Sequence, residues 1–248
     1  MVHTTGNWGG KSGPMDTQER GKVLSGSVIF SALSQEELGT IAGLASLRCF
    51  HEGEHILWEG SPSLWFYIVE RGKVKIVKQS PSGKEFILNV FTPGEMFGEV
   101  AAFEGRPYPA SARAMGETCV LGVGREDFLS FLAKNPTVTL KIIRVLGERL
   151  KQAHNRLRDL AGERVEQRIA SILLMLASKL GPELPFARQD IADMSGTTIE
   201  TAIRVMSRFG KGRIVRSRRG RVTILDEAGL RRISQGPRGP APECGPDL

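Results

Sequence analysis

Glu200 and Arg204 stand four residues apart in a segment with strong helical periodicity, so both side chains leave the same face of a helix. A guanidinium can pair with guanine O6 and N7, and a carboxylate can accept a hydrogen bond from cytosine N4. The alternative is an ordinary surface salt bridge between residues four apart. Four apolar residues occupy the opposite face and predict that the helix packs on a core: Ala202, Val205, Met206 and Phe209.

The sequence before this helix predicts a helix-turn-helix and so favours the DNA-reading interpretation. Residues 186–195 form a second short amphipathic run, and Gly196 supplies the left-handed backbone of a turn. Thr197 or Thr198 then caps the following helix. Two helices joined by a short glycine-containing turn are the helix-turn-helix arrangement.

After the helix, two β-prone runs surround a basic turn over residues 211–225, which predicts a β-hairpin wing. Its arginines (Arg216, Arg218, Arg219 and Arg221) could meet phosphates, and a solvated charged hairpin is the alternative. Residues 186–235 carry a net charge of +6, whereas the whole chain carries +7. This concentration indicates a DNA-binding module rather than a membrane-binding surface, since no long apolar face accompanies it. The candidate DNA-binding residues are Arg188, Thr198, Ile199, Glu200, Ile203, Arg204, Ser207, Arg218 and Arg219.

Length and composition fit two modest domains of a globular protein, with 248 residues, 40% of them hydrophobic and 25% charged. The sequence has no apolar run long enough for a transmembrane helix and no signal pattern, so we expect a cytoplasmic protein without a membrane partner. Cys49, Cys119 and Cys244 are far apart, and this odd number also indicates a reducing cytoplasm. The chain contains no P-loop, GxSxG or HExxH motif, and we expect no enzyme activity and no metal site.

The N-terminal half predicts a β-sandwich or barrel, because short β-prone runs alternate with glycines from about residue 48 to residue 124. Ser34 and Glu37 form a capping box for a helix ahead of it. Polar, Gly-rich or Pro-rich composition predicts disorder over residues 1–25 and 236–248. The expected strands are His55–Glu59, Leu64–Glu70, Lys73–Gln79, Glu85–Phe91, Ser111–Met115 and Thr118–Val123.

Three segments of this half resemble the cyclic-nucleotide-binding type of jelly roll: GEHILWEG at 53–60, FYIVERGKV at 66–74 and PGEMFGE at 93–99. With the helix-turn-helix, the chain from Phe30 to Ser234 resembles the CRP/FNR family of bacterial transcription regulators. The resemblance implies an α+β protein that binds palindromic promoter DNA as a homodimer and contacts RNA polymerase. The implied parts are a β-roll sensor domain (26–135), a dimerisation helix (136–161) and a winged helix-turn-helix (162–235).

The connecting helix, opened by Pro136, carries a stripe with the a and d spacing of a coiled coil. Arg149, Lys151, Arg156 and Arg158 surround this stripe. We expect it to pair with a second copy rather than with its own domain, so that two recognition helices read inverted half-sites. The predicted dimer seam is Ile143, Leu146, Leu150, Ala153, Leu157 and Leu160.

The resemblance also implies an effector pocket, but the usual cyclic AMP contacts are missing. In cyclic-AMP-binding relatives an arginine precedes the serine matched by Ser111, and here that residue is Ala110, while Arg106 lies across a Pro-Tyr-Pro turn. Losing the guanidinium removes a charge-assisted contact to the phosphate. We therefore expect an unidentified effector other than cyclic AMP. The expected pocket comprises Gly98, Glu99, Ser111, Ala153 and His154.

The same family resemblance limits which cofactors we expect. Residues 1–48 contain no cysteine, so the N-terminal iron–sulfur cluster of oxygen-sensing relatives is not expected. The alternative function is a haem-based gas or redox sensor, with His3, His51, His55 or His154 as candidate ligands. Cys119 is expected in the core. Cys49 is a candidate redox sensor, although nothing near it in the sequence indicates a lowered thiol pKa.

The residue before Glu200 places the recognition helix nearer the FNR side of the family. The cyclic AMP side carries arginine there, and this chain carries Ile199. By resemblance, Glu200 and Arg204 read the G·C pair of a TTG-type half-site, and Ile199 or Ile203 touches a thymine methyl.

Overall fold

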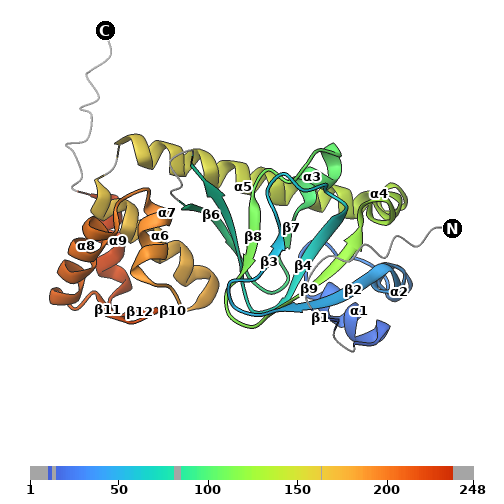
Figure 1. Cartoon of the computed structure of the whole chain (residues 1–248), viewed down its shortest axis with the longest axis horizontal. Coiled ribbons are helices and arrows are strands. Elements are labelled where there is room, and N and C mark those ends of the chain that lie inside the picture. The colour runs from blue at the N-terminus through green and yellow to red at the C-terminus, as the bar shows by residue number, and fades with distance from the viewer. Residues whose placement is uncertain (1–10, 13–14, 81–84, 163, 237–248) are drawn as a thin grey trace, which may run out of the picture. The chain divides into compact units, whose positions relative to one another are not determined.

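The computed structural model describes residues 11–12, 15–80, 85–162 and 164–236 (Figure 1). The chain divides into two compact units, residues 1–152 and 153–248, and the division falls inside one long helix. The first unit is a β-roll with helices, and the second is a small helical domain with a short sheet. The predicted α+β architecture is confirmed.

The β-roll consists of two antiparallel sheets. One sheet has the order β1-β2-β9-β4-β7, with strands Lys11–Ser12, Ala45–Phe50, Thr118–Gly124, Trp65–Arg71 and Met96–Phe97 in that order. The other sheet has the order β3-β8-β5-β6, with strands His55–Leu57, Ser111–Ala114, Val74–Gln79 and Glu85–Phe91. All six expected strands are present with ends shifted by at most two residues, whereas β2 and the short β1 and β7 were not expected.

Strand β4 shows why this unit holds together. Its side chains alternate between two cores, as the period of a strand requires. Phe66 and Ile68 pack among residues of the flanking helices, and the ring of Phe66 stacks on Phe128 with centroids 3.9 Å apart. Tyr67 and Val69 instead pack into the space between the two sheets. Because both faces of this strand are covered, its central residues are all apolar.

The β-roll is accompanied, before the long helix, by α1 (Thr17–Ser25), α2 (Gln35–Leu44), α3 (Glu99–Glu104) and α4 (Arg125–Lys134). The prediction of disorder over residues 1–25 is wrong for α1. Asp16 and Glu19 form a capping box at its start, and Leu24 is buried in the core. The polar composition concealed these local signals. The prediction is also wrong for residues 11–12, which form strand β1 and pair with β2. Residues 1–10 and 13–14, and the predicted disordered tail from residue 237 onward, lie outside the described residues.

The long helix α5 (Pro136–Gly162) begins at Pro136 as expected. Val138 and Ile142 are buried against the β-roll, and Leu146 is partly buried against the same core. This helix therefore belongs to its own domain along one side over its first turns.

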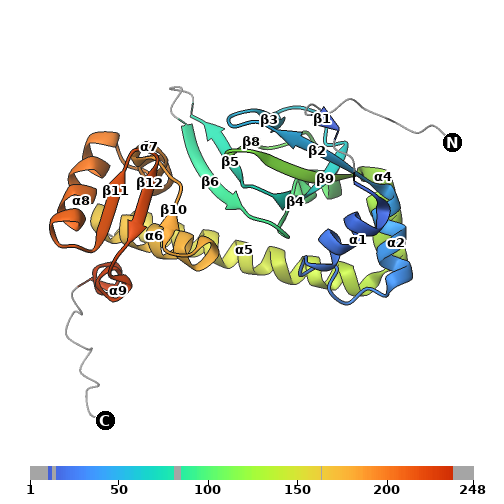
Figure 2. The same cartoon turned by 90° about the horizontal axis from the view of Figure 1, so that it is seen from below.

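The second unit contains α6 (Val165–Leu180), β10 (Glu183–Leu184), α7 (Arg188–Ser195), α8 (Ile199–Lys211), β11 (Val215–Arg218), β12 (Arg221–Ile224) and α9 (Glu227–Gln235). The helix-turn-helix and the wing hairpin lie at the expected residues, with β11 next to α8 (Figure 2). Strand β10 adds a third member to the wing sheet, and α9 packs on α6. Neither of these two elements was expected. Within the described residues, no helix is long and apolar enough to cross a membrane.

Cys49 and Cys119 are joined by a disulfide between strands β2 and β9. Cys119 is buried in the β-roll as expected, but the two cysteines are not independent thiols. Sequence reasoning missed the bond because 70 residues separate the two cysteines, and only the strand pairing brings them together.

Candidate functional site

The turn between α7 and α8 is held rigidly. Gly196 ends α7 with a left-handed φ of 63°, a conformation that favours glycine, and its N–H donates to the carbonyl of Ala192. The buried Ser195 hydroxyl donates to the carbonyl of Ile191 at 2.7 Å. Thr198 caps α8, since its Oγ1 accepts a hydrogen bond from the Thr201 N–H at 3.4 Å. These local bonds fix the angle at which α8 leaves the turn.

Helix α8 has the two faces that its periodicity predicts. The apolar face is fully buried, with Ala202, Val205, Met206 and Phe209 in the core of the unit. The outward face is exposed and consists of Glu200, Ile203, Arg204 and Ser207. Ile199, at the first turn, is half-buried. The helix thus presents an acid, a base and a branched apolar side chain on one accessible surface.

Glu200 and Arg204 do not pair with each other: among the described residues, the structure records no ion pair between them. Hydrogen bonds from the Glu200 backbone N–H and from the Thr198 side chain lower the pKa of the Glu200 carboxyl. Its carboxylate therefore stays ionised and able to accept hydrogen bonds. The surface-salt-bridge alternative does not describe this pair. Arg208, one turn beyond Arg204, forms an ion pair with Glu166 of α6 instead.

The wing places a second set of cations on the same unit. Arg218 and Arg221 face each other across the hairpin, and Gly220 makes its turn with a φ of 68°. Arg221 lies 3.3 Å from Glu183 of β10, whereas Arg219 at the tip is exposed. The wing is also tied to the helix-turn-helix, because Nε of Arg188, the first residue of α7, donates to the Ser217 hydroxyl at 3.3 Å.

A cavity of about 140 Å³ opens in the β-roll beside α3. Its wall is mostly apolar, and Glu99, the first residue of α3, is the charged residue among those that line it. The lining residues are Leu57, Ile76, Phe91, Phe97, Gly98, Glu99, Val100, Ala101, Tyr108, Pro109 and Ala110.

Glu99 is buried and is held by Arg149 of α5. Nη1 of Arg149 lies 2.6 Å from Oε1 of Glu99, its Nη2 donates to the Met96 carbonyl at 2.7 Å, and its guanidinium lies 4.6 Å from the centroid of the Phe91 ring. Burial raises the pKa of the Glu99 carboxyl, and the Arg149 charge opposes that rise. Sequence reasoning placed Arg149 beside the dimer seam and missed this role. The available signal was that a buried carboxylate such as Glu99 needs a cation as its partner.

The positions expected to contact an effector phosphate are differently occupied. Ala110, the position at which the family resemblance implies the phosphate-binding arginine, is buried in the cavity wall. Ser111 was expected in the pocket but does not line the cavity, because its hydroxyl accepts the Glu59 N–H at 2.9 Å. Arg106 is exposed and does not line the cavity. Ala153 and His154 are exposed residues of the second unit, and their role at this pocket stays a prediction.

Along α5, most of the predicted seam is solvent-accessible. Ile143, Leu150 and Leu157 are 59%, 57% and 64% exposed, and Ala153 is exposed too. Leu146 differs, because it packs partly against the β-roll core, and the side chain of Leu160 lies outside the described residues. Leu140, 57% exposed, lies three residues before Ile143 and was not part of the predicted seam.

The candidate haem ligands have other surroundings. His51 Nδ1 lies 2.7 Å from Glu117, and the ring of His55 stacks on Trp58 with centroids 3.4 Å apart. Burial, and then the charge of Arg113, lower the pKa of His55. His154 is exposed, and His3 lies outside the described residues. The described part of the chain holds no cluster of three or more His, Cys, Asp or Glu that could bind a metal ion.

Comparison with known proteins covers both units. Residues 47–135 match the model of the cyclic nucleotide-binding domain, and residues 167–233 match that of the Crp-like helix-turn-helix domain. The chain is 31% identical to the cyclic AMP receptor protein of Thermus thermophilus, over 86% of this chain and 99% of that protein. It is 29% identical to the nitrogen fixation regulation protein FixK of Bradyrhizobium diazoefficiens, over 82% and 87% of the two chains.

A solved structure is similar to this chain as well. A transcriptional regulator of the CRP family from Thermus thermophilus superposes with a TM-score of 0.66 and 25% identity, covering 76% of this chain and 97% of that one.

Proposed function

Because the chain belongs to the CRP/FNR family of transcription regulators, we propose that it is a homodimer that reads a palindromic, TTG-type promoter site and responds to an effector other than cyclic AMP. The family's regulators bind DNA through the helix-turn-helix, and the relatives are regulators rather than enzymes. RNA polymerase is the further partner of the proposed complex.

The observation that carries the DNA-reading proposal is the outward face of α8. Glu200 and Arg204 are exposed on neighbouring turns and are not neutralised by each other. A guanidinium and an ionised carboxylate in this state can exchange water for base-edge hydrogen bonds without first breaking an internal ion pair. Arg218 and Arg219 on the wing, with Arg188 beside it, supply phosphate contacts that position the helix.

The exposed stripe on α5 supports the homodimer. Ile143, Leu150 and Leu157 recur every seven residues and leave three large apolar side chains in water in the single chain. Covering them with a second copy buries this surface and relates two α8 helices by a two-fold axis. Two such helices would read inverted half-sites about one DNA turn apart.

The cavity supports an effector other than cyclic AMP. At about 140 Å³ it suits a small molecule, and its wall near Ala110 has no cation for a phosphate. Glu99 and Arg149 satisfy each other, so the polar end of the pocket is already neutral. We propose a compact, mainly apolar effector with one hydrogen-bonding group. The Thermus relative is named for cyclic AMP, and the alanine at position 110 argues against carrying that ligand over.

The base-reading role is tested with Arg204→Ala and a matched control, Arg208→Ala, on the same helix. Arg204→Ala should weaken binding to a TTG palindrome by about 1–3 kcal/mol per half-site and leave binding to scrambled DNA much less affected. Arg208→Ala should change both affinities alike, because its guanidinium is already paired with Glu166 of α6. Fluorescence anisotropy on both duplexes measures this, and equal losses for Arg204→Ala on the two duplexes refute the assignment.

The effector proposal is tested by titration calorimetry with cyclic AMP. Wild-type protein should give no micromolar binding, and Ala110→Arg should gain affinity, since it returns a guanidinium to the cavity wall. Micromolar binding to wild type, with a matching rise in DNA affinity, would overturn the proposal.

A further inference from the structure

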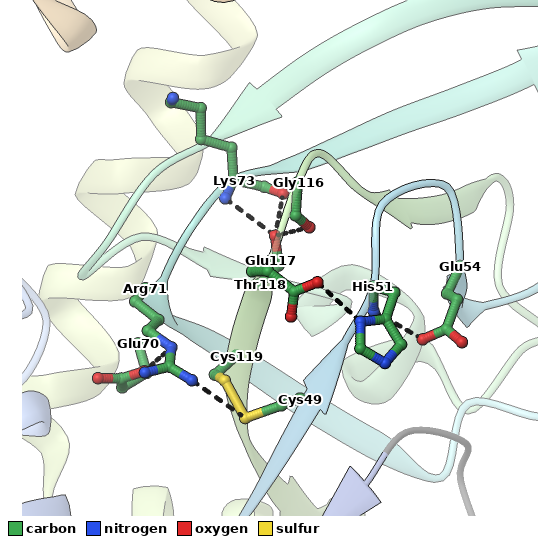
Figure 3. Close-up of a disulfide and its surroundings, with 10 residues drawn as sticks. All are labelled: Cys49, His51, Glu54, Glu70, Arg71, Lys73, Gly116, Glu117, Thr118 and Cys119. Carbon is green, nitrogen blue, oxygen red and sulfur yellow. Dashed lines mark hydrogen bonds and ion pairs between the residues drawn. A yellow bond between two sulfur atoms is a disulfide. The ribbon is translucent and has the colours of Figure 1, made fainter.

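The disulfide between Cys49 and Cys119 lies in the middle of a regular ladder. The two residues are direct partners in the antiparallel pairing of β2 with β9, and their Cα atoms are 4.0 Å apart (Figure 3). Hydrogen bonds on both sides hold these backbones in register, and β9 is paired with β4 on its other edge. The ladder would therefore keep the two thiols adjacent after the S–S bond is reduced, so the bond can form again without movement of the chain.

The two sulfurs have different surroundings. Cys119 is 1% exposed, whereas Cys49 is only partly buried. Nη2 of Arg71 lies 3.9 Å from Sγ of Cys49, and Arg71 itself extends into solvent with its Nε 3.7 Å from the Glu70 carboxylate. A guanidinium beside a sulfur favours the thiolate, which is the form that reacts with peroxides.

The carboxylate next to Cys119 is already paired with a histidine. In Figure 3 the Glu117 side chain, next to Cys119 in the sequence, points toward His51, and its Oε1 lies 2.7 Å from His51 Nδ1. Of the described cations in this view, the structure places Arg71 against Cys49. The asymmetry thus assigns an accessible, cation-assisted sulfur to Cys49 and a shielded partner to Cys119.

The expected compartment indicates that the bond is reversible, an argument that rests on the proposed function. A regulator that binds bacterial promoters works in the cytoplasm, where thiols are kept reduced. Disulfides that form there are usually transient and sense redox conditions.

We propose that Cys49 and Cys119 are a reversible thiol–disulfide couple in the β-roll, with Cys49 as the peroxide-reactive sulfur and Cys119 as the resolving one. The Cys49 thiolate attacks a peroxide oxygen and becomes a sulfenic acid; with hydrogen peroxide, the leaving hydroxide takes a proton to form water. The Cys119 thiol then attacks Cys49 Sγ, forms the disulfide and releases a second water. Two electrons pass from the two thiols to one peroxide.

Reduction reverses the couple. A dithiol reductant of the thioredoxin class attacks the accessible Cys49 Sγ and releases Cys119 as a thiolate, which takes a proton. The second thiol of the reductant then resolves the mixed disulfide and frees Cys49. The reductant becomes a disulfide, and two electrons and two protons reach the protein.

The test uses the full chain with Cys244→Ser, so that only this pair can react. After reduction and removal of the reductant, one equivalent of hydrogen peroxide should consume both thiols and form one intramolecular disulfide. Cys119→Ser should stop at a sulfenic acid on Cys49, trapped with dimedone and located by mass spectrometry. Cys49→Ser should leave the Cys119 thiol at least tenfold slower to react.

Two further measurements keep the test independent of whether these serine variants fold. Arg71→Gln should slow peroxide consumption severalfold, and Arg106→Gln, an exposed arginine of the same unit, should leave the rate unchanged. Cys49 and Cys119 thiols that survive one equivalent of peroxide in the Cys244→Ser protein, or a folded-state disulfide that thioredoxin cannot reduce, would overturn the proposal. None of these measurements involves DNA, so failure of the thiol–disulfide proposal can be distinguished from failure of the DNA-binding proposal.

Discussion

Arg149 and Arg204 are both arginines on amphipathic helices, but their side chains point in opposite directions, one into a core and one into solvent. Arg149 of α5 turns into the β-roll, where Glu99, the Met96 carbonyl and the Phe91 ring satisfy its guanidinium. Arg204 of α8 faces solvent one turn from a carboxylate that it does not bind. One cation holds a buried carboxyl that lines the β-roll cavity, and the other is left exposed to solvent.

This difference separates two kinds of functional residue. An outward charge opposite a buried stripe can be located from helical periodicity alone. An inward charge is defined by a partner from another element, here the start of α3, and nothing local distinguishes it from a surface residue. The β-roll unit is accordingly tied together internally, whereas the DNA-binding unit keeps its reading face free.

The largest effect is expected at the outward stripe of α5, whose large apolar side chains are exposed in the single chain. Leu150→Glu should weaken the homodimer by about 3–6 kcal/mol, because it removes two buried leucines per dimer. The control is Lys151→Glu, the exposed neighbour on the same helix. Sedimentation equilibrium measures the dissociation constant. An unchanged dimer in Leu150→Glu would place the interface elsewhere.

The next effect tests how much the disulfide stabilises the β-roll. The disulfide closes a loop of 70 residues, so reducing it should lower the free energy of unfolding of this unit by about 4 kcal/mol. Urea unfolding with and without dithiothreitol measures the change. Cys49→Ala with Cys119→Ala should behave like the reduced protein and ignore dithiothreitol. A reduced protein as stable as the oxidised one would contradict the cross-link.

A smaller effect is expected at Glu99, the buried carboxyl that pairs with Arg149. Burial raises the pKa of Glu99 above its ordinary value of 4.5, so its favourable contribution is present below pH 4.5 and is lost as pH rises through the folded-state pKa. Wild type should therefore lose stability relative to Glu99→Gln above pH 4.5, by at most about 1.4 kcal/mol per pH unit. Glu104→Gln, an exposed carboxyl on the same helix, controls for loss of charge. A difference that grows in the opposite direction would contradict the buried-carboxyl account.

The smallest effect is expected at the wing, where Arg219 is proposed to contact a DNA phosphate. Arg219→Ala should lower the salt dependence of DNA binding, with the slope of log K against log salt falling by about 0.9 per lost phosphate contact. The loss should be similar on specific and scrambled duplexes, unlike that of Arg204→Ala. Arg231→Ala, whose guanidinium pairs with Glu227 on α9, is the control. An Arg219→Ala loss confined to the specific duplex would make this residue a base reader.

The same division explains what sequence reasoning reached. It located the faces of α8, the Gly196 turn, the wing and the six main strands, because each depends on spacing within one element. It missed Arg149, the Cys49–Cys119 bond and the position of Ser111 outside the cavity, because each depends on pairing between distant segments. Helix α1 is the exception, since its capping box was visible locally and was hidden only by the polar composition around it.

We infer that the exposed face of α8 makes this protein a sequence-specific reader of a two-fold site. Selection of duplexes from a random library, followed by affinity measurement at fixed salt, tests it most directly. The account predicts enrichment of an inverted TTG-type repeat with half-site centres about 10 base pairs apart, bound at least about 10³-fold more tightly than scrambled DNA. Recovery of unrelated sequences with equal affinity for scrambled DNA would contradict it.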